Sequence, residues 1–311
     1  DQRSSVDLLR TPGGEPRARA PGWLDSLFET GVVREVSRLG WGFQHETWTM
    51  LLVDGRRLAV TVLPDTEASA SVVALTAGLH SRLRAAGVPA PAVVEHLAVP
   101  GYAPLVTGFV DGTPGGALLD TVGGPAMIGS LLGATWRRLA CVDTAGLALP
   151  TSWTEPERLA LESTARSRRV RARLTASEGQ RLSVGIAPLA ALLAHRRPGF
   201  VHGDFVPVNV LVDDGMLVAL LDFESARLGE PLLDAAWFHC IVAYHHPAEE
   251  AEAWRAFAAA ADLDTLESAS PDLLRILPLI RLLEILDDDR LSEDRADHWI
   301  GVLRSWLARW P

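Results

Sequence analysis

The stretch "FVHGDFVPVNVLVDDGMLVALLDFE", residues 200–224, decides the fold. Its apolar start indicates a strand that ends in a turn at Asp204. Two apolar runs then flank Asp214-Gly215, a pair typical of two-residue hairpin loops. The hairpin should bring Asp222 back to about the level of Asn209.

The three polar residues Asp204, Asn209 and Asp222 therefore fall at strand ends. Asn209 and Asp222 form an oxygen-only pair, which suits a hard cation such as Mg²⁺. Asp204 remains nearby to accept a proton or to orient a hydroxyl. Each residue alone is a common turn residue. Together, at these spacings, they indicate phosphoryl transfer, in which catalysis is mostly positioning and charge neutralisation.

The sequence before this stretch predicts a small antiparallel sheet with one helix. Two alternating apolar segments begin at Val33, and the second contains the hairpin signal Asp54-Gly55. Apolar residues at helical spacing predict a helix over 68–87 that ends at Gly87. The segment 93–112 predicts two further strands.

The sequence after Gly112 is mainly helical in its periodicity. Helices are expected within 127–146, 185–196, 233–244, 248–263, 273–286 and 295–310. We therefore predict an α+β, bilobal chain. It would have a mobile tail at 1–21, an N-lobe at 22–111, and a helical C-lobe at 112–311 that carries the catalytic loop 202–209 and the metal segment 222–224.

Composition bounds the class of protein. The 311 residues are 48% hydrophobic, with a net charge of −10 and a pI near 5.4. The negative charge argues against nucleic acid and leaves room for a cationic small molecule or a peptide. No apolar run approaches the roughly 20 residues of a membrane span, and no secretory signal is present, so a cytoplasmic protein is expected. Cys141 and Cys240 are predicted to be buried free thiols.

The motif "HGDFVPVN" followed by "LLDFE" resembles the aminoglycoside phosphotransferase family, a branch of the protein-kinase-like fold. The similarity runs from about Val33 to Asp234. It implies that Asp204 is the catalytic base, that Asn209 and Asp222 hold Mg²⁺, and that ATP or GTP is the co-substrate.

The same resemblance assigns further residues. His202 and Asp234 would support the catalytic loop, and Glu224 is either close to the metal or a surface carboxylate. "LVTGFVDGTP" resembles the linker that binds the nucleotide base, with Thr107 and Phe109. Ala59 would pack on the adenine. Gly40, Gly42 and His45 are candidates for a phosphate loop, although a G-x-G pattern is also common in hairpins.

The pattern breaks at the cation that should neutralise the phosphates. The chain contains no lysine, and Thr61 stands where the resemblance calls for one. Thr76 lies near the position of the glutamate that would pair with it. His45, Arg82 or Arg84 could supply a displaced cation, or the enzyme could be slow and rely on Mg²⁺. A ligand-binding pseudokinase is the third alternative, and the retained catalytic trio favours activity over it.

The acceptor side is less specific. Asp287, Asp288 and Asp289 in "ILDDDRLSED", with Glu249 upstream, suit a cationic acceptor, but such runs are usually solvated helix ends. Five arginines within 166–173 suggest either a helix paired with Glu162 and Glu178 or a dock for an acidic peptide. We expect phosphorylation of a small-molecule natural product or antibiotic. The alternatives are a Ser/Thr kinase of a biosynthetic peptide and the pseudokinase.

Overall fold

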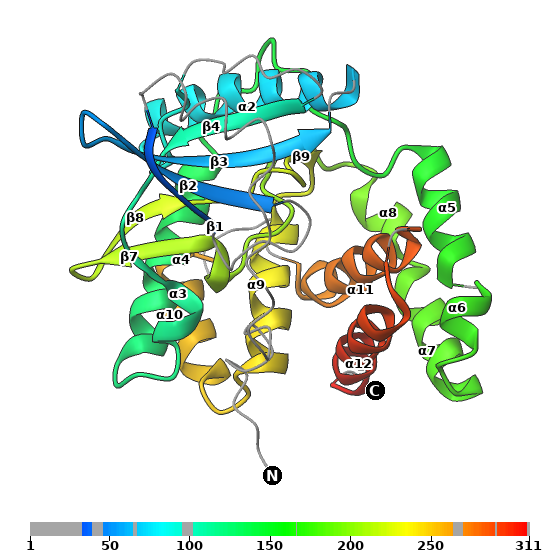
Figure 1. The fold of residues 1–311 in the computed structure, drawn as a ribbon. Helices are drawn as coiled ribbons and strands as arrows, with labels where there is room; N and C mark the ends of the chain where they lie inside the picture. The colour runs from blue at the N-terminus through cyan, green and yellow to red at the C-terminus, as the bar shows by residue number, and fades with distance from the viewer. Residues whose placement is uncertain are drawn as a thin grey trace.

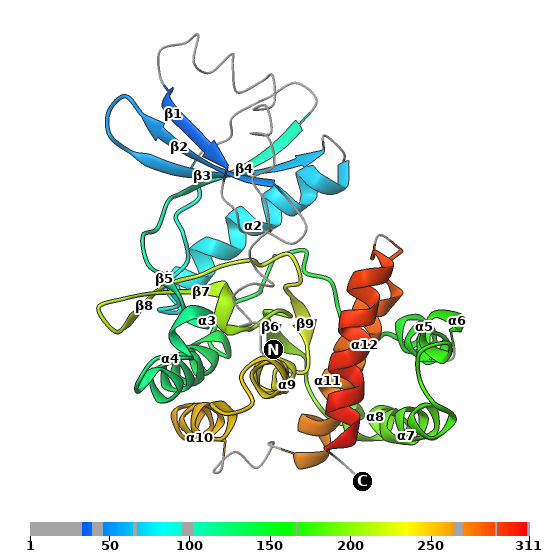
Figure 2. The ribbon, with the colours of Figure 1, turned by 60° about the horizontal axis from the view of Figure 1, so that its bottom comes forward.

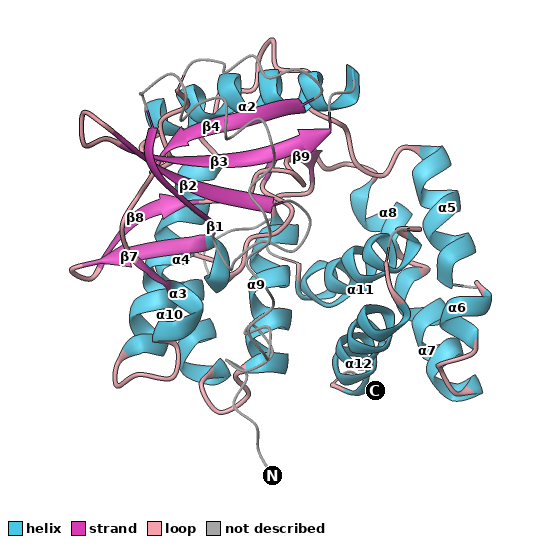
Figure 3. Ribbon diagram, viewed as in Figure 1, coloured by secondary structure: helices cyan, strands magenta, loops and turns pink. Residues whose placement is uncertain are grey.

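The computed structural model describes residues 33–38, 46–64, 67–94, 102–165, 167–263, 270–289 and 291–309. A small antiparallel sheet with one helix forms one end of the molecule, and a larger helical part forms the other (Figures 1 and 3). The predicted α+β, kinase-like architecture is confirmed. The expected tail at 1–21 lies outside the described residues.

The N-lobe sheet has the strand order β1-β2-β3-β4, all antiparallel. Its strands are β1 (Val33–Arg38), β2 (Glu46–Leu52), β3 (Arg57–Pro64) and β4 (Tyr102–Gly108). The predicted turn between β2 and β3 is present, with Gly55 at φ 87°. Alternate residues of β2, Trp48 and Met50 among them, are buried on one face. The first of the two strands expected in 93–112 is, among the described residues, only a bridge from Val93 to Thr107.

Helix α2 (Glu67–Ala85) ends as predicted, because Gly87 adopts φ 74° and stops it. Its buried residues Leu79 and Leu83 do not join the small core of the sheet. They belong to the large hydrophobic core that also contains the catalytic-loop residue Phe205. The helix therefore anchors the N-lobe to the C-lobe.

The C-lobe contains the expected hairpin. Strands β7 (Val210–Asp213) and β8 (Met216–Leu220) are joined by Asp214 and Gly215, both at positive φ. Strand β5 (Thr113–Pro114) extends this pair to three strands. A separate pair, which the sequence did not signal in full, joins β6 (Gly199–Val201) to β9 (Arg227–Gly229).

Helices make up the remainder (Figure 2). They are α3 (Gly115–Leu118), α4 (Gly124–Leu139), α5 (Glu155–Ala165), α6 (Arg168–Arg171), α7 (Ala176–Ile186), α8 (Leu189–Leu193), α9 (Leu232–His245), α10 (Glu250–Ala261), α11 (Pro271–Asp287) and α12 (Glu293–Ala308). Each of the six predicted helical ranges overlaps one of them: α8 and α10 lie inside their predicted ranges, whereas α4, α9, α11 and α12 begin before theirs. Helix α7 was missed, although its capping box, Thr175 with Glu178, is a recognisable start signal.

Two predictions about bulk properties can be compared with the structure. Among the helices that the structure describes, none combines the length and the apolar character that a membrane crossing requires. Both cysteines are free thiols, but only Cys240 is buried. Cys141 is exposed, so its predicted burial was wrong; it follows the end of α4, at the surface.

Candidate active site

The catalytic loop begins where β6 ends. Gly203 has φ 82°, and a Cβ there would overlap the backbone carbonyl of Ser225, so both the conformation and the space require glycine. The chain then passes through a short 3-10 turn, Pro207–Asn209, before β7. This path leaves the Asp204 side chain partly exposed at the end of a buried strand.

Two side chains hold the Asp204 carboxylate. Asn209 Nδ2 donates to Asp204 Oδ2 at 2.8 Å and to the Asp204 carbonyl at 2.9 Å. Trp237 Nε1, from α9, donates to Asp204 Oδ1 at 2.9 Å. Each carboxylate oxygen thus accepts one hydrogen bond and retains a lone pair for a further partner.

The backbone of the loop is held from α9. Asp234 accepts from the N–H of His202 at 2.8 Å and of Gly203 at 2.9 Å, one bond to each carboxylate oxygen. Complete burial raises the pKa of Asp234 to about 7, while these two donors pull it down. The structure therefore brings His202 and Asp234 together around the loop, at the positions where the resemblance placed them.

His202 links the catalytic loop to the strand that precedes Asp222. Burial lowers the pKa of His202, which keeps its ring neutral. Nδ1 accepts from the N–H of Asp204 at 3.2 Å, so the ring proton lies on Nε2, which donates to the Leu221 carbonyl at 2.9 Å. The Leu221 N–H in turn donates to the Asn209 carbonyl at 2.8 Å, which brings residues 209 and 221 side by side.

Asp222 follows directly, in the left-handed region at φ 62°. Its side chain reaches solvent. Even so, desolvation by the surrounding protein, together with repulsion from Asp204 and Glu224, raises the pKa of Asp222 to about 7. Asp204 and Glu224 thus both place negative charge close to Asp222, an arrangement that a bound cation would stabilise.

The donor set fits a hard divalent cation. Asp222 supplies carboxylate oxygens. Asn209 uses its amide nitrogen on Asp204, and within the described part of the chain its Oδ1 accepts no hydrogen bond. Such oxygen ligands are those that Mg²⁺ and Ca²⁺ prefer. Glu224 is exposed beside this pair.

A series of aromatic rings connects α2 to the catalytic loop. His80 of α2 contacts Phe223 at 5.2 Å between ring centroids, and Phe223 contacts His202 at 4.8 Å. His202 contacts Phe205 at 5.9 Å. Because Phe223 is the neighbour of Asp222, this packing fixes the metal segment between the helix and the loop.

The nucleotide candidates on the sheet occupy the edge nearest the linker. Ala59 pairs with Thr107 across β3 and β4. The Phe109 N–H donates to the Arg57 carbonyl at 3.0 Å, and the Arg57 guanidinium lies 3.9 Å from the centre of the Phe109 ring. Gly40, Gly42 and His45 lie outside the described residues.

Thr61 has no charge to offer the phosphates. Its hydroxyl lies 3.3 Å from that of Thr47 on the neighbouring strand. Arg82, a candidate substitute cation, is paired with Asp143 and also donates to the Ala145 carbonyl at 3.3 Å. Arg84 is exposed and forms no ion pair with the described residues. Thr76 is buried in α2.

A cavity of about 280 Å³ lies in the C-lobe. Its walls come from α5, α11, β9 and the loop before α5, and they include Ser152, Arg227, Arg281, Glu284 and Asp287. One wall residue lies close to the metal segment, because Arg281 donates at 3.0 Å to Oγ of Ser225, the residue that follows this segment. Of the predicted acceptor residues, the structure places Asp287 at this cavity.

The polar wall of the cavity is an ion-pair cluster. Arg227 makes two hydrogen bonds to Glu284, at 3.0 and 2.8 Å, and Arg281 makes a third at 3.2 Å. Burial opposes ionisation of Glu284, but the two guanidiniums outweigh it and hold its pKa below the usual range. The cavity therefore presents paired charges of both signs, in contrast to a purely acidic surface.

Part of the arginine run is paired with acidic residues of α12. Arg173 pairs with Glu293 and Asp297, and Arg169 donates to the carbonyls of Leu286 and Asp288. The expected partners of the run were wrong, because Glu162 pairs with Arg158 and Glu178 with Arg304. Asp289 is exposed and forms no ion pair with the described residues, and Arg166 lies outside them.

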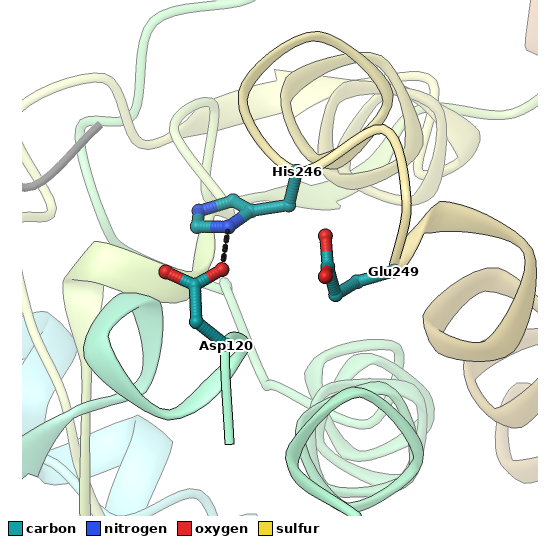
Figure 4. Close-up of side chains that lie close together, drawn as sticks. All are labelled: Asp120, His246 and Glu249. Carbon is teal, nitrogen blue, oxygen red and sulfur yellow. Dashed lines mark hydrogen bonds and ion pairs between the residues drawn. The ribbon is translucent and has the colours of Figure 1, made fainter. Parts of the chain in front are cut away.

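Glu249 lies in a different group. It directly precedes α10 and faces His246 and Asp120, and the candidate ligand atoms of the three all lie within 4.8 Å of one another (Figure 4). His246 Nδ1 and Asp120 Oδ1 are 2.9 Å apart. No contact joins Glu249 to the Asp204 loop in the described chain.

Comparison with known proteins gives a consistent result. The model of the phosphotransferase enzyme family matches residues 35–311. A thermostable mutant of aminoglycoside phosphotransferase APH(4)-Ia, solved with ADP and hygromycin B, has a TM-score of 0.66 at 16% identity, covering 91% of this chain and 97% of that one. No curated protein sequence matches.

Two further structures share the fold. Macrolide 2'-phosphotransferase MphH from Brachybacterium faecium has a TM-score of 0.59 at 19% identity, covering 85% of this chain and 90% of that one. Amicoumacin kinase hAmiN, solved with AMP-PNP, Ca²⁺ and Ami, has a TM-score of 0.63 at 14% identity, covering 98% and 96%. At these identities the structural likeness concerns the fold.

Sequence reasoning missed the long-range members of the site. Trp237, which reads as a core residue at helical spacing, donates to Asp204. Arg227 carried no local signal, because its partner Glu284 is remote in the chain. Arg281 lies three residues before Glu284 on α11, a spacing that could have indicated their pair. The helical period of α9 contained one usable clue: Trp237 follows Asp234 by three residues and so shares its helix face.

Proposed function

The chain belongs to the phosphotransferase enzyme family, and on that premise we propose that it transfers the γ-phosphoryl group of ATP or GTP to a hydroxyl of a small-molecule natural product or antibiotic. The observation that carries the proposal is the geometry at Asp204. A carboxylate oriented by Asn209 and Trp237 lies beside an oxygen-rich pair, Asn209 and Asp222, that suits a divalent cation.

In this proposal Asp204 orients the acceptor hydroxyl and accepts its proton as the oxygen attacks the γ-phosphorus. Asn209 and Asp222 would hold Mg²⁺, with Glu224 close by. The bound metal would offset negative charge on the phosphates. Asp234 and neutral His202 keep the loop in place, so that the carboxylate need not reorganise during the reaction.

The acceptor would bind at the C-lobe cavity next to the metal segment. Its volume, about 280 Å³, is near the lower end of the range for small-molecule sites. Because the lining sets Arg227 and Arg281 among its carboxylates, we favour an acceptor that presents hydroxyl or amide groups there over a polycation that needs an acidic surface. Macrolide and amicoumacin phosphotransferases among the similar structures make such acceptors sensible first choices.

One observation favours a second candidate function. Thr61 and Thr76 replace both partners of the usual lysine–glutamate pair, as in a pseudokinase that binds a ligand without chemistry. The peptide-kinase alternative has less support. Two arginines of its proposed docking surface already have partners within the chain: Arg169 donates to a carbonyl of α11, and Arg173 pairs with two carboxylates of α12.

The test is product formation on a panel of hydroxylated antibiotics, each incubated with ATP or GTP and Mg²⁺ and followed by the mass increase of one phosphoryl group. Asp204→Asn is the matched variant, because it keeps the size of the side chain and removes the base. We expect its kcat to fall by about 10²- to 10⁴-fold, the usual contribution of a general base, while nucleotide affinity is retained.

Two outcomes would contradict the proposal. Equal turnover by wild type and Asp204→Asn would exclude Asp204 as the base. Nucleotide binding without turnover on any acceptor would move the pseudokinase to the front.

A further inference from the structure

Trp237 differs from the other tryptophans whose indole N–H groups have partners in the described chain. Trp136 donates to the Pro231 carbonyl at 3.0 Å, and Trp306 donates to the Arg275 carbonyl at 2.9 Å. Trp153 donates to the Glu284 carboxylate, which already binds Arg227 and Arg281. Trp237, fully buried in α9, instead donates to the carboxylate of Asp204.

We infer that Trp237 is a positioning residue for Asp204, which fixes the carboxylate in the orientation that the reaction needs. This inference rests on the proposed function of Asp204. The two donors act on opposite oxygens: Asn209 Nδ2 on Oδ2 at 2.8 Å and Trp237 Nε1 on Oδ1 at 2.9 Å. Rotation of the carboxylate about its Cβ–Cγ bond breaks both hydrogen bonds.

The first two turns of α9 hold the catalytic loop in place. Asp234 holds the backbone of His202 and Gly203, and Trp237, three residues later on the same helix face, holds the side chain of Asp204. Both anchors are buried and lie on a regular helix. Side chains supported in this way hold a catalytic group more accurately than a loop does.

Trp237 also ties this position to the C-terminal helix. Its ring lies 5.8 Å from that of Trp299 in α12, at an interplanar angle of 30°. The ring cannot turn away without disturbing this packing, which keeps the N–H directed at Asp204. The hydrogen bond orients Asp204 and also satisfies the buried indole N–H of Trp237, which would have no partner if Asp204 were lost.

The first experiment measures the hydrogen bond itself. In ¹H–¹⁵N spectra of the full chain, the Trp237 indole signal is assigned by its disappearance in Trp237→Phe. We expect it to move in Asp204→Ala, while the Trp306 signal stays in place. A Trp237 signal that does not respond to Asp204→Ala overturns the inference, whatever the protein phosphorylates.

The second experiment measures the consequence. Trp237→Phe keeps an aromatic ring against Trp299 and removes only the donor and part of the ring. Trp306→Phe is the matched control, because it also removes a buried indole hydrogen bond from the C-lobe but none to Asp204. With the acceptor found in the panel, we expect Trp237→Phe to lower kcat by about ten- to one-hundredfold, the value of a hydrogen bond to a charged group, with both KM values within about twofold of wild type.

The outcomes separate the two proposals. If Trp306→Phe lowers kcat as much as Trp237→Phe does, the effect is general destabilisation and the positioning role is wrong. If wild type is active and Trp237→Phe has the same kcat, the positioning role alone is wrong. If wild type phosphorylates no acceptor, the proposed function fails, and the catalytic part of this inference fails with it.

Discussion

Thr61 is the residue at which the site departs most from a kinase-like arrangement. A hydroxyl cannot neutralise a triphosphate, and this one is within hydrogen-bond distance of Thr47, at 3.3 Å. Arg82 does not compensate within the described chain, because it pairs with Asp143. Under the proposed function, the charge of the phosphates would be met mainly by a metal ion held at Asn209 and Asp222.

Replacement of Thr61 tests this distribution of charge. We expect Thr61→Ala to change the dissociation constant of Mg²⁺–ATP by less than about twofold, because the hydrogen bond lost is between neutral groups on the sheet. Calorimetry measures the change, with Asn209→Ala as the variant that should abolish metal-dependent binding. A large loss in Thr61→Ala would show that the hydroxyl itself contacts the nucleotide.

Glu284 carries the second residue-level prediction. Its carboxylate lies between the guanidiniums of Arg227 and Arg281. Glu284→Gln leaves two buried cations without their counter-charge, and such a loss costs about 3–5 kcal/mol of unfolding free energy. Glu162→Gln, which breaks the more exposed pair with Arg158, is the control and should cost less than about 1 kcal/mol.

The effect of Glu284→Gln depends on pH with a definite sign. The pKa of Glu284 is lowered in the folded chain from its ordinary value of 4.5. The stabilisation is therefore fully present above that value and is lost as the pH falls through the lower, folded-state pKa. Urea unfolding of both proteins should give a difference that is constant near neutrality and that closes in acid. A difference unchanged in acid would mean that the charge of Glu284 is not the cause.

At the scale of elements, the close contact of α4 with α10 depends on two glycines. A Cβ at Gly129 would overlap the Ala253 carbonyl, and one at Gly133 would overlap the Phe257 carbonyl. The sequence predicted both helices, but apolar periodicity does not show how closely the axes of α4 and α10 approach each other. Glycine within a helix costs about 1 kcal/mol relative to alanine, so its presence on this face has a packing reason.

A pair of glycine substitutions tests this reason. Gly129→Ala should destabilise the protein by about 1–3 kcal/mol, because helix α10 must move away. Gly179→Ala in α7 faces open space and should stabilise by up to about 1 kcal/mol through helix propensity. Thermal unfolding distinguishes the two, and stabilisation by both substitutions would contradict the packing account.

How much the sequence could predict depended on the range of the interactions. The hairpin through Asp214 and Gly215 was predictable because its signal is local, and it delivered Asp222 to the level of Asn209. The hydrogen bond from Trp237 to Asp204 spans 33 residues and depends on how α9 packs, so no local pattern encodes it. The arginine run was assigned the wrong partners for the same reason: its counter-charges come from α12.

At the scale of the whole molecule, two features affect nucleotide binding: the negative charge of the protein and the division of its hydrophobic core into two clusters. The chain carries a net charge of −10, and at the site Asp204 and Glu224 both repel the Asp222 carboxylate. The sheet has its own small core, while α2 joins the large one. A nucleotide bound between sheet and catalytic loop would therefore meet an acidic protein whose charge a metal must offset.

The measurement that tests this account most directly is calorimetric binding of ATP and GTP to wild type and Asp222→Asn, each with Mg²⁺ and with a chelator. We predict binding of at least one nucleotide to wild type only when Mg²⁺ is present, and its loss in Asp222→Asn. Equal binding in the chelator, or full Mg²⁺-dependent binding by Asp222→Asn, would contradict the central claim that Asn209 and Asp222 hold the metal that replaces the missing cation.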